Sequence, residues 1–74
     1  MTQTLDQFAA AQLRAEAARR DLSAVDIAGR IGVRVEWVRR RMKGDVPMSI
    51  RDLERFAAAL ELPPARFLPL ERAA

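Results

Sequence analysis

The chain has 74 residues, half of them hydrophobic, which predicts one folded domain with a small core over residues 1–74. It contains neither cysteine nor histidine, which excludes a disulfide framework and argues against a zinc site, and no apolar run is long enough to span a membrane. The formal net charge is +3, and the excess is local: residues 34–43 carry five basic side chains and one acidic one, residues 1–33 carry four of each, and residues 44–74 carry four and five.

The helical periodicity of the apolar residues predicts an all-α fold of five helices. In chain order, the predicted helices cover about residues 5–20, 24–31, 35–43, 50–61 and 64–68, followed by a tail at 69–74. The first, second and fourth each follow a capping box, in which a serine or threonine precedes the helix and an amide or acidic residue stands three positions later: Thr4 with Gln7, Ser23 with Asp26, and Ser49 with Asp52. Gly32 and Gly44 can end helices in the left-handed conformation, and Pro64 can open the last one.

The second and third predicted helices are joined only by Gly32, Val33 and Arg34. Two short helices connected by about three residues that begin with glycine are typical of the helix-turn-helix arrangement. In that arrangement the second helix can enter the major groove of DNA. Ala28 is small enough to let the helices cross closely, and apolar residues would fill the joint: Ile27, Ile31, Val33 and Val38.

The predicted third helix has an apolar side and a charged side. At about 100° per residue, with Val38 at the centre of the buried side, Val35 and Met42 lie within about 60° of it. Roughly 100–160° away lie the charged side chains Glu36, Arg39, Arg40 and Lys43. Trp37 and Arg41 share one flank, where the arginine stem would cover apolar surface or the tryptophan ring.

Three cations and one carboxylate on one helix face suit DNA. Arginine can bind guanine O6 and N7 or a phosphate, glutamate can accept from cytosine N4, and valine can contact a thymine methyl. We therefore expect base contacts from Val35, Glu36, Arg39, Arg40 and Lys43. The free N–H groups at the start of the second helix, near Ser23 and Ala24, would bind a phosphate.

The segments LSAVDIAGRIGVRVEWVRRRMKG and VPMSIRDLERFAAALELPPARFL resemble the lambda-repressor and Cro-type helix-turn-helix domains, also called the XRE family, over about residues 13–70. The resemblance implies a five-helix DNA-binding fold that is usually dimeric on two-fold operators, with further phosphate contacts from Arg34, Ser49 and Arg51. For Arg41 the sequence allows two roles, a phosphate contact or a structural role in which its stem covers apolar surface. Two residues depart from the family pattern: Ala24 replaces a frequent glutamine, and Arg34 replaces a frequent serine or threonine and cannot cap its helix.

Together these features predict a sequence-specific double-stranded DNA-binding transcription regulator, of the small phage-type repressor or Cro-like kind, that lies in the cytoplasm with the nucleoid. It would form a homodimer on a palindromic operator, use no cofactor and catalyse no reaction. The alternative is a protein-interaction module of the same fold, antitoxin-like or a docking domain, whose acidic partner would use the same arginines. The charged face could also be merely solvated, with a Glu36–Arg40 pair. Trp37 is expected to pack rather than to stack on bases. The residues expected in the core or at a dimer seam are Leu62, Phe67, Leu68 and Leu70.

Overall fold

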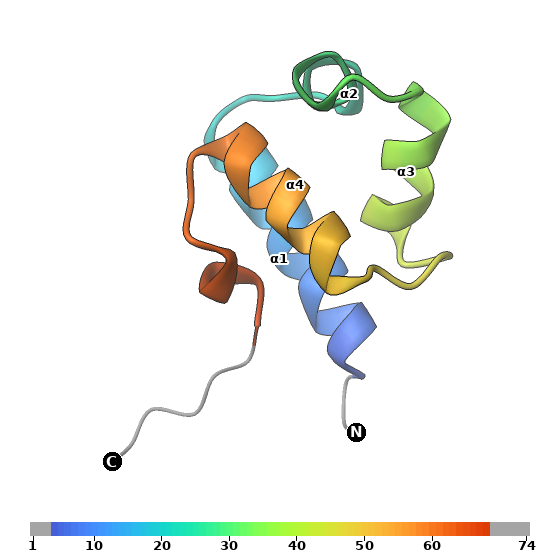
Figure 1. The fold of residues 1–74 in the computed structure, drawn as a ribbon, viewed down its shortest axis with the longest axis vertical. Coiled ribbons are helices and arrows are strands. Elements are labelled where there is room, and N and C mark those ends of the chain that lie inside the picture. Colours follow the sequence, from blue (N-terminus) through green and yellow to red (C-terminus); the bar gives the residue numbers. More distant parts are fainter. Residues whose placement is uncertain (1–3, 69–74) are drawn as a thin grey trace.

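The computed structural model describes residues 4–68, which form four α-helices and one short 3-10 helix (Figure 1). In chain order these are α1 (Leu5–Arg19), α2 (Ala24–Ile31), α3 (Val35–Lys43), α4 (Ile50–Leu60) and η1 (Pro64–Phe67). The all-α class is confirmed, and α2 and α3 have the predicted bounds. The expected count of five α-helices is wrong, because the last element is a 3-10 turn.

The 3-10 geometry of η1 has a local cause. Its backbone hydrogen bonds join residues three apart, from Arg66 N–H to the carbonyl oxygen of Pro63 and from Leu68 N–H to that of Ala65, both at 3.0 Å. Pro64 has no N–H to donate, and four residues are too few to propagate α-helical bonds. Leu70, expected in the core, lies outside the described residues.

Side-chain hydrogen bonds cap the starts of α1, α2 and α4. All three predicted capping boxes form, at Thr4, Ser23 and Ser49, each with its side chain accepting from the N–H three residues later and its own N–H donating back. These bonds satisfy donors that have no partner within the helix.

A residue with positive φ lies one or two positions after the end of each of the four α-helices. Two of these residues are the predicted Gly32 (φ 87°) and Gly44 (φ 86°), and the other two are Asp21 and Glu61. At Glu61 the next amide, that of Leu62, donates to the carbonyl oxygen of Ala57 at 2.8 Å and closes the turn. Helix α4 therefore ends at Leu60, one residue earlier than the apolar stripe predicts.

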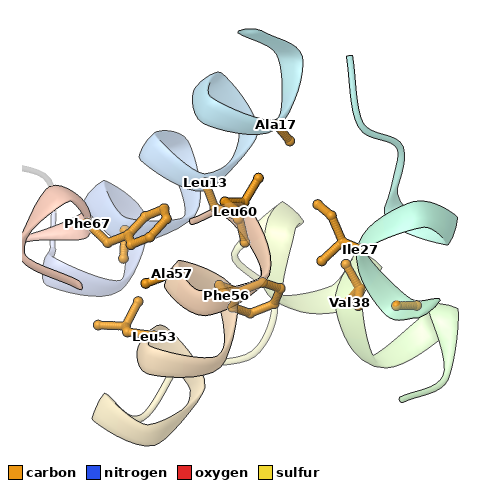
Figure 2. Packing of buried hydrophobic residues seen from close by; sticks show 11 residues of the cluster. Leu13, Ala17, Ile27, Val38, Leu53, Phe56, Ala57, Leu60 and Phe67 are labelled. Atoms are coloured by element: carbon orange, nitrogen blue, oxygen red, sulfur yellow. The ribbon is translucent and has the colours of Figure 1, made fainter. Parts of the chain in front are cut away.

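The core lies around α4 and takes side chains from every element. Figure 2 shows Phe56 and Leu60 of α4 between Ile27 and Val38 on one side and Phe67 on the other. The largest side chains with almost no exposed surface are Phe56, Phe67, Leu13, Ile27, Leu60, Glu16 and Val38. Since residues of all five elements share one cluster, burial of this surface stabilises the position of α3.

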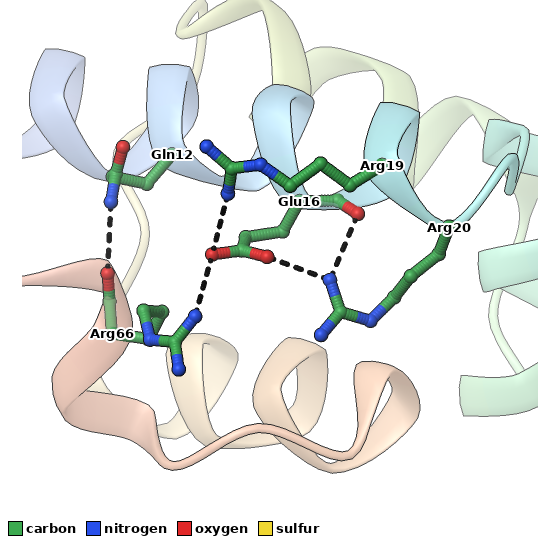
Figure 3. A network of polar contacts seen from close by, with 5 residues as sticks. All are labelled: Gln12, Glu16, Arg19, Arg20 and Arg66. Atoms are coloured by element: carbon green, nitrogen blue, oxygen red, sulfur yellow. Dashed lines mark hydrogen bonds and ion pairs between the residues drawn. The ribbon is translucent and has the colours of Figure 1, made fainter.

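Glu16 is the one charged residue buried among the described residues, and the sequence pattern did not single it out. Its carboxylate is paired with Arg20 at 2.6 Å, Arg19 at 3.0 Å and Arg66 at 3.1 Å (Figure 3). Gln12 also donates to the backbone carbonyl oxygen of Arg66 at 3.2 Å. Helix η1 therefore binds α1 through ion pairs and hydrogen bonds as well as through apolar packing.

Candidate nucleic-acid interface

The joint between α2 and α3 has the geometry that the sequence predicts. The N–H groups of Gly32 and Val33 both donate to the carbonyl oxygen of Ala28, at 2.8 and 3.1 Å, so the chain turns sharply after α2. Ala28 and Ile27 are buried beneath the joint together with Val38 of α3. This packing sets α3 at the edge of the molecule, where it contacts α1 and α2 (Figure 1).

Helix α3 presents the predicted faces. Val38 is fully buried, whereas Val35 and Met42 are half-buried beside it. The exposed residues are Glu36, Arg39, Arg40 and Lys43, which we call the outward face. The structure therefore brings together on one exposed surface four of the five residues predicted to contact bases, with Val35 at its border.

The charges of the outward face remain available to a ligand. Its one ion pair within the described residues joins Arg39 to Glu36 at 3.8 Å, with side chains 55% and 68% exposed. The Glu36–Arg40 pair considered from the sequence is not the one that forms. Because a long, exposed pair of this kind contributes little and is screened by salt, both groups can exchange it for a better partner.

Helix α3 begins without a side-chain cap. Arg34 occupies the N-cap position with extended backbone (φ −72°, ψ 146°), and no side-chain hydrogen bond caps the helix, as its identity predicts. Its side chain is instead exposed. At the other end, Arg14 of α1 donates a hydrogen bond to the carbonyl oxygen of Met42, which supplies a cation where the helix dipole is negative. The sequence pattern did not indicate Arg14, because its partner lies 28 residues away.

Besides Arg34, the residues predicted to contact phosphate lie at the starts of α2 and α4. Ser23 and Ser49 are exposed, but their hydroxyl groups already cap their helices. Ala24 is the first residue of α2 and offers only its N–H group, which has no acceptor within the helix. Arg51, on the first turn of α4, is exposed.

Each of these starts also holds a carboxylate. Asp26 accepts from the N–H and the hydroxyl of Ser23 at 2.9 and 3.0 Å, and these bonds hold the pKa of Asp26 below its ordinary value. Asp52 occupies the matching position in α4. A phosphate would therefore approach the outermost amides of each helix, beside a fixed negative charge.

Trp37 and Arg41 lie on the predicted flank of α3 but make contacts that the sequence did not specify. The Trp37 ring stacks on Phe56 of α4 with ring centroids 5.5 Å apart, so it packs as predicted. The Arg41 guanidinium lies 4.0 Å from the centroid of the Trp37 ring and its Nε donates to Asp52 at 3.2 Å. The sequence predicted the first contact as one of two options but contained no sign of the second.

The sequence model of a family described as helix-turn-helix domain matches residues 9–70. The chain belongs to this helix-turn-helix family. Neither the comparison with curated proteins nor that with solved structures gives a match. In this helix-turn-helix domain the matched segment includes the whole of α2 and α3, so the family assignment and the observed joint agree.

Two further properties concern the part of the chain that the structure describes. No helix between residues 4 and 68 is long and apolar enough to cross a membrane. The same residues contain no group of side chains arranged to hold a metal ion.

Proposed function

We propose that this helix-turn-helix domain is a sequence-specific double-stranded DNA-binding transcription regulator that reads the major groove with α3. The observation that carries the proposal is the outward face, which follows the helix-turn-helix joint and has its charges exposed while Val38 holds the helix to the core. The major groove of B-DNA is wide enough for one α-helix, so such a face can reach the edges of the bases.

The roles divide by chemistry. Base contacts come from Val35 and the outward face, with arginine to guanine and Glu36 to cytosine as the natural pairs. Phosphate contacts come from Arg34, from Arg51, and from the amides at the helix starts near Ser23, Ala24 and Ser49. In this division the phosphate contacts position the domain, and α3 discriminates between sequences.

The regulator is best described as a small phage-type repressor or Cro-like protein. As a homodimer it would bind a palindromic operator, with half-site centres about 34 Å apart, one turn of the double helix. The two-fold axis of such an operator would match that of the protein.

The test begins with selection of bound duplexes from a random genomic pool, followed by measurement of Kd at several salt concentrations. Affinity should fall steeply with salt because phosphate contacts release counterions. Arg39→Ala should change the preferred sequence and cost about 1–3 kcal/mol at the selected site. Arg51→Ala should weaken all sequences alike and reduce the salt slope by about one.

Arg55→Ala is the matched control, since Arg55 lies one turn further along α4 and is also exposed. It should leave the sequence preference unchanged. A flat salt dependence would refute DNA binding, and equal losses at all sites for Arg39→Ala and Arg51→Ala would refute the division of roles.

A protein-interaction module is the second candidate. An open cavity of about 590 Å³ between the end of α2 and α4 favours it, because its lining combines apolar Ile31 and Val33 with a net positive charge from Arg30 and Arg55 against Glu61. An acidic partner segment would suit that lining. Failure to enrich any sequence from the pool at physiological salt would support this candidate over the first.

A further inference from the structure

The backbones of α3 and α4 do not approach each other closely. Within the described chain, α3 has Cα neighbours within 8 Å in α1 and α2 but none in α4. The space between the two helices is bridged by long side chains, namely Trp37 and Arg41 of α3 with Phe56 and Asp52 of α4. The core around Val38 and the contacts with α1 and α2 hold α3 in place, and these side chains are the further contacts that fix its rotation relative to α4.

Arg41 is bound on three sides. Its Nη1 donates to the carbonyl oxygen of Trp37 at 3.2 Å, its guanidinium covers the Trp37 ring, and its Nε reaches the Asp52 carboxylate. The side chains of Arg41 and Asp52 are only 16% and 14% exposed. Because an ion pair shielded from water in this way is less screened than one on the surface, it can hold a defined geometry.

Asp52 connects this contact to the start of α4. The same oxygen, Oδ2, that binds Arg41 also accepts from the N–H of Ser49 at 3.1 Å. The N–H of Asp52 in turn donates to the Ser49 hydroxyl at 3.0 Å. The Asp52 carboxylate thus caps the start of α4, where we propose phosphate contacts, and also binds the flank of α3, the helix proposed to contact bases.

We propose that Arg41 and Asp52 are positioning residues that set the rotation of α3 against the first turn of α4 and thereby determine sequence discrimination. This inference rests on the proposed function. Side chains extend about 5–6 Å from a helix axis, so a rotation of about 20° displaces their ends by about 2 Å. That displacement is larger than the spread of donor–acceptor distances over which a hydrogen bond forms. Arg40 and its neighbours on the outward face would therefore lose their base contacts.

The other role open to Arg41, a phosphate contact, predicts the opposite sign for one variant. If Arg41 binds phosphate, Asp52→Asn removes a competing anion and strengthens binding to every duplex. If the pair positions α3, Asp52→Asn weakens the selected operator more than a scrambled duplex. Asparagine keeps an oxygen that can accept from Ser49 N–H, so the capping bond can survive the substitution.

The experiment measures Kd for the selected operator and a scrambled duplex at several salt concentrations, for wild type, Arg41→Lys, Arg41→Gln and Asp52→Asn. We expect the Kd for the scrambled duplex divided by the Kd for the operator to fall by about fivefold to 160-fold in each variant, which is the range for one lost base contact. The salt slope of Arg41→Lys should be unchanged. Equal weakening of both duplexes, or stronger binding by Asp52→Asn, would overturn the proposal.

Two control variants separate general effects. Arg55→Gln removes a cation that lies 5.9 Å from the Trp37 ring but forms no ion pair with Asp52. Asp26→Asn removes the corresponding capping carboxylate of α2, which has no arginine bonded to it. Both should keep the wild-type Kd ratio, and circular dichroism confirms that every variant is folded.

A measurement without DNA distinguishes failure of this inference from failure of the proposed function. Wild type that binds no duplex refutes the function alone. The indole N–H resonance of Trp37 then reports the pair: Arg41→Gln and Asp52→Asn should shift it alike, and the double variant should add little. Independent, additive shifts, or none, would show that the two residues do not act together on α3.

Discussion

Glu16→Gln should destabilise the fold through the contact between α1 and η1. Glu16 is buried, and its carboxylate accepts from three guanidinium groups on Arg19, Arg20 and Arg66. Glutamine fills the same space but has no charge and directs an NH₂ group toward one of these cations. The variant therefore loses charge-assisted hydrogen bonds without creating a cavity.

The magnitude follows from the exposure of the partners. Loss of one member of a fully buried pair costs about 3–5 kcal/mol, because the other charge is left without water. Here the side chains of Arg19, Arg20 and Arg66 are 65%, 32% and 48% exposed and can be hydrated again. We expect a loss of about 2 kcal/mol in the free energy of unfolding, roughly 8–16 °C in Tm for a domain of this size.

The pH dependence gives an independent check. Burial raises the pKa of Glu16, but the hydrogen bonds from Arg20, Arg66 and Arg19 together lower it by more than burial raises it. The pKa of Glu16 therefore lies below the ordinary 4.5. The unfolded chain then binds this proton more readily than the folded one. The stability that Glu16 contributes is complete above about pH 4.5 and is lost as the pH falls through the lower folded pKa.

The assay is thermal unfolding followed by circular dichroism from pH 7 down to pH 3, with Glu54→Gln as the control because Glu54 is exposed on α4. The control should change stability by less than about 0.5 kcal/mol. The difference between wild type and Glu16→Gln should shrink as the solution is acidified. A loss at pH 7 no larger than that of the control, or one that does not change with pH, would refute this reasoning.

Three further changes test the two ends of the helix-turn-helix joint and the interior of α2. Gly32→Ala should cost about 1–2 kcal/mol because φ is +87°, although nothing lies within 4 Å of the added Cβ. Gly29→Ala, inside α2 and also with nothing near the added Cβ, should instead stabilise by about 0.5–1 kcal/mol, and denaturant unfolding that gives both the same sign would contradict the argument. Arg34→Ser should add a cap to α3 and raise stability by about 0.5–1 kcal/mol while lowering the salt slope of DNA binding by about one, so an unchanged slope would remove Arg34 from the phosphate contacts.

Short sequence patterns, each spanning only a few residues, predicted most of the helices. Capping boxes, helix-ending glycines and 3.6-residue periodicity depend on the local backbone, so they located α2 and α3 and separated the outward face from Val38 before any packing was known. The same local reasoning was wrong about η1, where apolar periodicity over four residues does not distinguish a 3-10 turn from an α-helix.

The sequence by itself therefore determined the all-α class, the helix-turn-helix joint and the orientation of the α3 side chains. Only the tertiary structure decided which distant groups meet: Glu16 with Arg66 across 50 residues, and Arg14 with the carbonyl oxygen of Met42 across 28. An arginine can donate hydrogen bonds to many carboxylates or carbonyl groups, and separation along the sequence does not predict which of them it meets. The position of Arg41 on α3 did not determine whether it contacts phosphate or packs within the protein. Its contact with Asp52 is formed only because the fold places α4 beside it.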